Sequence, residues 1–200
     1  MRHHEGKTFL SNPKLFRADR ALYFPNLHGR TLISSGHGDD TTPILRHKIS
    51  VVSIFSSTWA ERQTQTFVSE KENPDLSVVL QESDGAARRV DINVEENAIK
   101  AGLIRLFMPN IRRRIPRHRH GRYFLVRKGI SEEIRDAIGF LNGKVGYVYL
   151  LDGECRIRWA GSGRAAREEK ESLVRGVRRL VDEWRVRCES SAITRDTEER

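Results

Sequence analysis

Cysteine thiols are the side chains with the most direct chemistry in this sequence, which contains two of them, Cys155 and Cys188. A catalytic thiol needs a helix N-terminus or a nearby cation that lowers its pKa. Cys155 lies in a predicted strand and Cys188 near the end of the last predicted helix, and a small thiol in a strand is usually part of the core. Two cysteines are also too few for a disulfide scaffold. We interpret both as reduced structural thiols.

Two other motifs could bind small ligands. Residues 161–166, GSGRAA, match the G-x-G-x-x-A dinucleotide pattern, but the preceding strand belongs to a hairpin and no strand follows the helix. We interpret them as a tight turn between strand and helix. His118 and His120 could face one way on an extended segment, but the arginines around them disfavour a cation. The sequence therefore predicts neither a cofactor nor a metal site.

A cluster of arginines is the feature with the clearest binding chemistry. Residues 97–131 contain ten lysines and arginines and no acid, which accounts for the whole net charge of +9. The guanidinium group suits anionic lipid headgroups, an acidic protein surface or RNA, and the alternative is a solvated basic loop. RNA is the weaker option, because no Phe, Tyr or Trp lies among the arginines of residues 112–122 and no RNA-binding motif surrounds them. The candidate partner-binding or lipid-binding residues are Arg112, Arg113, Arg114, Arg117, Arg119, Arg122 and Tyr123.

The elements that must position these residues follow from apolar spacing. Continuous apolar runs predict strands at residues 49–55, 76–80, 123–126 and 145–151, with a hairpin partner at 154–159. Residues 21–31 predict a short apolar strand followed by a Pro-Asn and His-Gly turn. Capping-box patterns predict helices that begin at Thr58 and at Asn93, the second ending at Pro109. A further helix follows Ser131 and is closed by residues 142–143. The last helix carries Leu173, Val177, Leu180 and Trp184 on one face.

This order of elements predicts an α/β fold of thioredoxin-like or peroxiredoxin-like type. We expect a mixed sheet with helices on both faces, ending in a β-hairpin and a helix. Asp152 and Gly153 would form a two-residue hairpin turn. We expect the domain to cover residues 18–188, between a disordered N-terminal segment at 1–17 and a disordered tail at 189–200.

In thioredoxin-like enzymes the redox cysteine follows the first core strand, at the N-terminus of a helix. Here residues 56–63 read SSTWAERQ, and Trp59 and Arg62 occupy the approximate positions of the two cysteines. Gly146 stands where such enzymes have a cis-proline before the hairpin. Disulfide exchange and peroxide reduction at the usual site are therefore excluded.

The apolar content of 38% against 32% charged residues indicates a globular protein, and charged residues interrupt every apolar run before it could span a bilayer. We expect that the chain can lie on a membrane but not cross it. Residues 1–14 are too short and too poor in Ser and Leu for a full organellar presequence. If the protein is organellar, we expect most of its targeting segment to lie outside this chain.

Whole phrases of the sequence carry a family resemblance. FRADRALYFPNLHG, ISVVSIFSSTWAERQTQTF, ENAIK, HGRYFLVRKG, LNGKVGYVYLLD and CRIRWAGSG occur in this order between residues 16 and 186. They resemble the fungal mitochondrial ATP synthase assembly factor family that chaperones subunit a of the membrane sector. The resemblance implies a thioredoxin-like, redox-inactive protein on the matrix side of the mitochondrial inner membrane. It implies no catalytic residue.

Our hypothesis from the sequence is a non-enzymatic assembly chaperone without a cofactor. Its partners would be subunit a, which it helps to join the c-subunit ring, and the inner-membrane surface with its anionic lipid. Two alternatives from other classes stay open. One is a thiol-dependent oxidoreductase that uses a non-standard cysteine, and the other is a basic RNA-binding module. The oligomeric state does not follow from the sequence.

Overall fold

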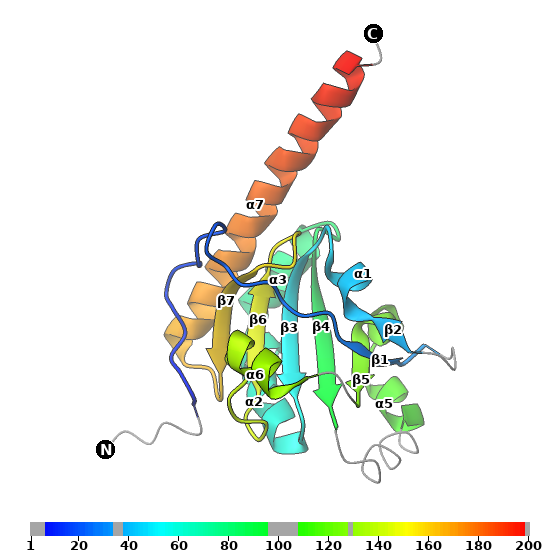
Figure 1. Cartoon of the computed structure of the whole chain (residues 1–200), viewed down its shortest axis with the longest axis vertical. Coiled ribbons are helices and arrows are strands. Elements are labelled where there is room, and N and C mark those ends of the chain that lie inside the picture. The colour runs from blue at the N-terminus through cyan, green and yellow to red at the C-terminus, as the bar shows by residue number, and fades with distance from the viewer. Residues whose placement is uncertain (1–6, 34–37, 96–107, 128–129, 199–200) are drawn as a thin grey trace.

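A seven-stranded mixed sheet forms the centre of the protein, in the order β2-β1-β5-β4-β3-β6-β7 (Figure 1). The computed structural model describes residues 7–33, 38–95, 108–127 and 130–198. The strands are β1 His28–Thr31, β2 Asp39–Asp40, β3 Ile49–Phe55, β4 Ala87–Val94, β5 Tyr123–Val126, β6 Tyr147–Leu151 and β7 Ile157–Ser162. The helices are α1 Thr41–Leu45, α2 Thr58–Val68, α3 Pro74–Glu82, α5 Met108–Arg114, η1 Arg117–Arg122, α6 Glu132–Ile138 and α7 Arg167–Glu198.

The central strands run parallel and the outer ones antiparallel. β3 pairs in parallel with β4 from Ile49↔Ala87 to Phe55↔Asn93, and β4 pairs in parallel with β5. β6 returns antiparallel to β3, and β7 antiparallel to β6. All seven residues of β3 are buried, as its continuous apolar run requires. The predicted mixed sheet with a C-terminal hairpin and helix is confirmed.

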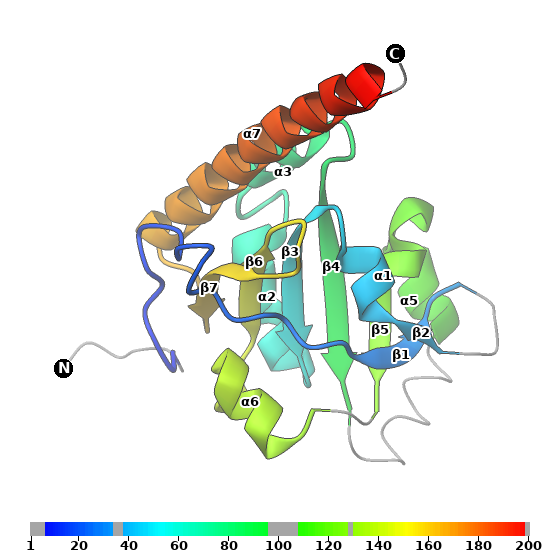
Figure 2. The same cartoon turned by 45° about the horizontal axis from the view of Figure 1, so that its top comes forward.

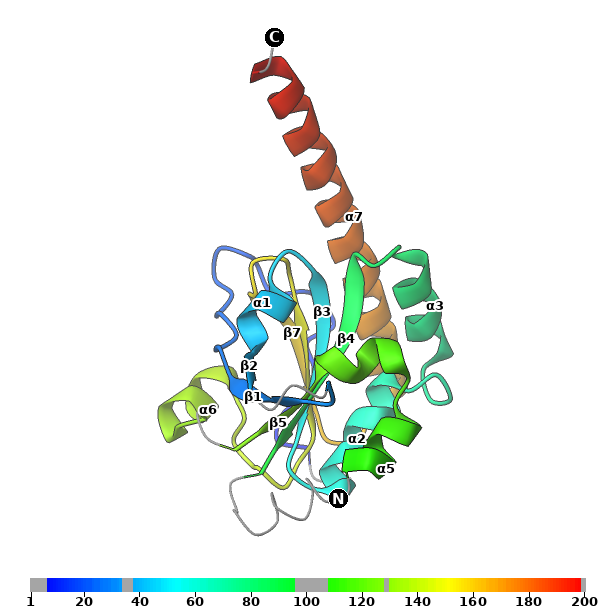
Figure 3. The same cartoon turned by 90° about the vertical axis from the view of Figure 1, so that its right-hand side faces the viewer.

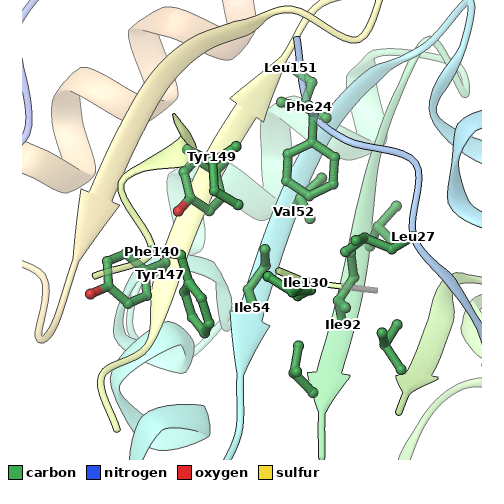
Figure 4. Packing of buried hydrophobic residues seen from close by; sticks show 14 of the residues in the cluster. Phe24, Leu27, Val52, Ile54, Ile92, Ile130, Phe140, Tyr147, Tyr149 and Leu151 are labelled. Carbon is green, nitrogen blue, oxygen red and sulfur yellow. The ribbon is translucent and has the colours of Figure 1, made fainter. Parts of the chain in front are cut away.

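Helices cover both faces of the sheet, as predicted (Figure 3). On one face α1, α6 and residues 24–27 pack on β3, β4 and β6, where Tyr147 and Tyr149 stack with ring centroids 6.4 Å apart (Figure 4). On the other face α2, α3 and α7 pack on the same strands around Trp159. The predicted face of α7 is confirmed, since Leu173, Val177 and Leu180 are buried.

Several predicted boundaries were wrong. Residues 76–80 belong to helix α3, which has Pro74 in its first turn, and the second central strand is β4 instead. Ser57 rather than Thr58 caps α2, accepting a hydrogen bond from the Ala60 amide. Pro109 lies inside α5. The helix predicted to begin at Asn93 is wrong at its start, because Asn93 lies in β4, and its residues 96–107 fall outside the described part. Residues 28–29, predicted as a turn, begin strand β1.

The connections around α6 and the hairpin also differ from the predictions. α6 ends at Gly139, whose positive φ of 71° forms the C-cap, so residues 142–143 lie beyond the helix. The hairpin loop is longer than two residues, because β7 begins only at Ile157. Asp152 organises this loop by accepting hydrogen bonds from the Glu154 and Arg156 amides, each at 3.0 Å.

Residues 7–17 and 189–198 are more ordered than expected. Lys7 Nζ forms a 2.5 Å ion pair with Glu169, and the Phe16 amide donates to the Arg158 carbonyl, so residues 7–17 are fixed to β7 and α7 (Figure 2). The expected disordered segment therefore does not describe these residues. Helix α7 continues to Glu198, through most of the expected tail. The amphipathic face that predicts the helix ends near Trp184, which is why the sequence pattern stops earlier than the helix.

Candidate functional site

The position of a thioredoxin redox site lies where β3 ends and α2 begins. Ser57 Oγ caps α2 by accepting the Ala60 amide at 3.1 Å, and Ser56 Oγ donates to the Gly143 carbonyl. The first turn of α2 therefore uses its polar groups to hold itself and the 139–146 loop together. Trp59 is 53% exposed here, and Arg62 is exposed as well. Two long side chains, one aromatic and one cationic, thus point outward where an enzyme would have thiols.

Gly146 occupies the place of the cis-proline, and its backbone is pressed against α2. The Gly146 amide donates to Gln63 Oε1 at 2.9 Å, and a Cβ added to Gly146 would lie 2.3 Å from the Ala60 carbonyl oxygen. No peptide bond in the described ranges is cis. In a redox enzyme the corresponding loop presents substrate to the thiols. Here the loop contacts α2 directly at Gly146.

Cys155 lies at the other end of the sheet, in the loop between β6 and β7. This loop adjoins the start of β3, because the His47 amide donates to the Gly153 carbonyl at 2.7 Å. Cys155 is buried, and burial raises the pKa of its thiol. Cys188 is exposed on α7, and neither cysteine forms a disulfide. The structure does not bring either thiol to the α2 N-terminus.

We expect the two thiols to differ in their rate of alkylation. A raised pKa leaves less thiolate at neutral pH, and burial hinders the reagent, so N-ethylmaleimide should modify Cys188 at least ten times faster than Cys155. Mass spectrometry of peptides from briefly treated native protein measures both rates. Unfolding in urea should make the rates similar, and preferential labelling of Cys155 in the native protein would contradict the structural role.

The arginine cluster divides into side chains that hold the fold and side chains that face outward. Arg112 Nε donates to the Leu32 carbonyl at 2.7 Å, and His120 Nε2 lies 2.9 Å from the Ile115 carbonyl oxygen. Helix α5 packs through Met108 and Ile111 on a small core that includes Tyr123. Tyr123 is 4% exposed, so it is a core residue and not the surface contact predicted from the sequence.

Arg119 points inward to a buried carboxylate. Asp91 Oδ2 accepts from Arg119, while Asp91 Oδ1 accepts from Arg89 Nε at 3.0 Å and Nη2 at 2.8 Å. Asp91 also helps to raise the pKa of Glu61, after the larger effect of burial. Arg122 donates to the His118 carbonyl at 2.7 Å within η1.

The remaining arginines form a cationic surface, which we define as Arg113, Arg114 and Arg117. Their side chains are exposed and form no hydrogen bond or ion pair with any other residue that the structure describes, although the charge of Arg114 acts to lower the pKa of Glu61. Their placement at the end of α5 and the start of η1 leaves the guanidinium groups free to meet an anionic partner. Three of the six arginines predicted to bind a partner or lipid therefore remain candidates for that role.

Comparison with known proteins decides the family. The sequence model described as ATP10 protein matches residues 1–180. The chain belongs to the ATP10 protein family. The mitochondrial ATPase complex subunit ATP10 of Candida glabrata is 34% identical over 179 residues, which cover 89% of this chain and 64% of that protein. The protein of the same name from Saccharomyces cerevisiae is 29% identical, over 88% of this chain and 66% of that protein.

This ATP10 family member spans less than two thirds of the length of these relatives. Among solved structures, a secreted thiol-disulfide isomerase from Corynebacterium glutamicum is similar, with a TM-score of 0.52 and 13% identity over 88% of this chain and 99% of that one. The predicted thioredoxin-like fold is confirmed. At this identity the likeness concerns the fold alone.

In this ATP10 family member the N-terminal segment packs against the glycine motif at residues 161–166. Ser162 Oγ accepts from the Thr8 and Phe9 amides, each at 3.1 Å, and Glu169 accepts from the Ala166 amide at 2.8 Å. The α7 N-terminus is thus satisfied by a carboxylate, which supports the interpretation as a turn. Within the described ranges no three His, Cys, Asp or Glu side chains gather as a metal site.

An apolar cavity of about 660 Å³ lies between the N-terminal segment, α6 and β7. Phe9, Leu15 and Phe16 line one side, and Ile138 and Ile157 the other. Leu22 also lines the cavity and is 59% exposed. The sequence did not predict this groove, because its walls come from three segments far apart in the chain, one of which was expected to be disordered.

Sequence reasoning also missed Arg88, Arg89 and Asp91 of β4. Residues 90, 92 and 94 are apolar and alternate with polar ones, a strand signal that could have located them. None of the described helices has an apolar stretch that could cross a bilayer.

Proposed function

We propose that this protein is a non-enzymatic assembly factor of mitochondrial ATP synthase, which promotes the joining of subunit a to the c-subunit ring in the proton-translocating sector. The observation that carries the proposal is the family match over residues 1–180. The relatives are named as subunits of the mitochondrial ATPase complex. We further propose a peripheral position on the matrix side of the inner membrane.

The absence of cysteine at the usual redox position supports a binding role. Trp59 and Arg62 replace the thiols, and Gly146 is packed against α2, so the scaffold presents a surface without thiol chemistry at its usual site. The apolar groove beside Leu22 offers a place for a hydrophobic segment, as a membrane subunit would expose before assembly. In this proposal the groove holds subunit a while the cationic surface faces the membrane.

Deletion of the gene tests the function. We expect native gels of the deletion strain to show ATP synthase that lacks subunit a, and the full-length gene to restore it. A gene with Cys155→Ser and Cys188→Ser should restore assembly equally well, which would remove the thiol-enzyme alternative. Normal subunit a content in the deletion strain would sink the proposal. If subunit a is lost in the deletion strain, photo-crosslinkers at Leu22 and Trp59 should show which surface binds subunit a. Val78 on α3, which is also exposed, is the control position.

The cationic surface should control membrane association. Each arginine near an anionic leaflet contributes about 1 kcal/mol, so replacing all three by glutamine should weaken binding to anionic vesicles roughly 100-fold. Co-sedimentation with vesicles that contain anionic phospholipid measures the loss, and wild-type binding should fall as salt rises.

A matched control removes the same charge from the outer face of α7. Arg175, Arg178 and Arg179 are exposed there, and their replacement by glutamine should leave vesicle binding close to wild type. Equal weakening by both triple variants would mean that net charge, not this surface, governs association.

A further inference from the structure

A second basic site lies in a cavity of about 370 Å³ that α3, the start of β4 and η1 line. Four arginines line it, two from β4 and two from η1: Arg88, Arg89, Arg119 and Arg122. α2, α3 and α5 lie on this side of the sheet (Figure 3). Four guanidinium groups in one cavity require either matching acids or an anionic ligand.

The strand register explains why the cavity exists. β5 pairs with β4 only from Asp91↔Tyr123 onward, so the first half of β4 extends past the end of β5. η1, which leads into β5, contacts β4, and its Arg119 pairs with Asp91. The arginines of β4 and η1 that line the cavity therefore border a space beside β4 that β5 does not fill.

Only one of the four arginines has its hydrogen bonds largely provided by the fold. Arg89 binds Asp91 through two nitrogens and donates to the Val68 carbonyl at 3.0 Å through the third. Arg119 shares the same carboxylate. Asp91 is thus the single carboxylate bound to arginines of the cavity among the residues described, and it serves two of them.

Arg119 keeps a buried donor without a partner. Its Nε is buried and forms no hydrogen bond within the described part of the chain. A buried N–H that lacks an acceptor costs about 1–3 kcal/mol, unless a ligand supplies the acceptor. The unpaired donor lies on a side chain that lines the cavity.

Arg88 and Arg122 are half-buried without a carboxylate partner in the described structure. The pKa of Arg122 is lowered by burial and then by Arg119, and the pKa of Arg88 by burial and then by Arg122. The guanidinium groups are therefore close enough to repel one another. Glu70 lines the same cavity and is exposed, without an ion pair in the described ranges. The cavity keeps a positive excess with Glu70 counted.

We propose that this cavity binds a phosphate group, either free or on a phospholipid headgroup, through Arg88, Arg119 and Arg122. Guanidinium groups match the oxygens of phosphate with paired N–H donors, and a phosphate can accept from several of them at once. Bound phosphate would offset the repulsion between the arginines and supply an acceptor for Arg119 Nε. The inference does not depend on the assembly role, because it concerns binding by the purified protein.

Binding is tested with the full chain and two probes, inorganic phosphate and soluble dihexanoyl phosphatidic acid, at constant ionic strength. We expect at least one probe to raise the melting temperature saturably and to broaden its phosphorus NMR signal. Dihexanoyl phosphatidylcholine, whose headgroup carries no net charge, is the comparison lipid. Binding of both probes indicates that the phosphate group suffices, and binding of phosphatidic acid alone indicates a headgroup site. Either result supports the proposal.

The double variant Arg88→Gln with Arg122→Gln should lose at least tenfold in affinity for the probe. Without probe its stability should stay close to that of wild type, because the loss of the exposed Arg122 bond to the His118 carbonyl is offset by the removal of like charges that repel. Arg175→Gln with Arg178→Gln on α7 removes the same charge elsewhere and should bind as wild type does. Failure of both probes to bind wild type, or an equal loss in the two double variants, overturns the proposal.

Discussion

Gly146→Ala should lower the free energy of unfolding by about 3 kcal/mol, because the added methyl group would overlap the backbone of α2. Its Cβ would lie 2.3 Å from the Ala60 carbonyl oxygen and 2.8 Å from Thr64 Cγ2. A helix carbonyl cannot rotate away as a flexible side chain could. Urea unfolding of both proteins, followed by tryptophan fluorescence, measures the difference.

Gly143→Ala is the matched control in the same loop. A Cβ at Gly143 meets no atom within 4 Å, so its stability should stay within about 0.5 kcal/mol of wild type. Equal stability of the two variants would contradict the close approach of Gly146 to α2. The same crowding, together with the Gly146 amide donated to Gln63, makes this position unsuited to the proline of a redox enzyme.

Asp91→Asn should cost about 3 kcal/mol, because it leaves the Arg89 and Arg119 guanidinium groups without their shared carboxylate. Removing one partner of a buried ion pair typically costs 3–5 kcal/mol, and we take the lower end because the Arg119 side chain is 22% exposed. Urea unfolding measures the loss. Limited trypsin digestion should also cut the variant faster within η1, which Arg119 ties to β4.

Asp19→Asn provides the control, since it breaks an arginine–aspartate pair of similar geometry at the surface. The Arg17 and Asp19 side chains are 75% and 58% exposed, so their pair contributes at most about 1 kcal/mol. A loss in Asp91→Asn no larger than that in Asp19→Asn would show that Asp91 does not hold η1 in place.

The fold class followed from the sequence where apolar runs were unbroken. β3 and β5 lie where predicted, at residues 49–55 and 123–126, because strands buried on both faces read as continuous apolar residues. β4 was missed because its apolar residues alternate with polar ones and therefore form no continuous apolar run. Residues 76–80 were assigned to a strand because a short apolar run fits a buried helix equally well, and Pro74 was the signal of a helix start.

The candidate sites were less accessible to sequence reasoning. The loss of redox chemistry at the α2 N-terminus needed only the residue types at 56–63. The arginine cluster was visible in the sequence as a run of positive charge. Which of its arginines hold the fold and which face outward depends on partners far away in the chain. Leu32 holds Arg112 and Asp91 holds Arg119, while Arg113 has no described partner. Spacing along the sequence carries no information about such pairs.

Helix α7 divides into two parts that differ in how they are stabilised. Its first part buries Leu173, Val177 and Leu180 against the sheet, whereas its C-terminal part extends away from the sheet into solvent (Figure 1). A helical segment without tertiary packing is marginal in water, so this part should fray and re-form independently of the domain. This part of α7 thus has a folding equilibrium of its own, and a partner that binds it would shift that equilibrium without straining the sheet.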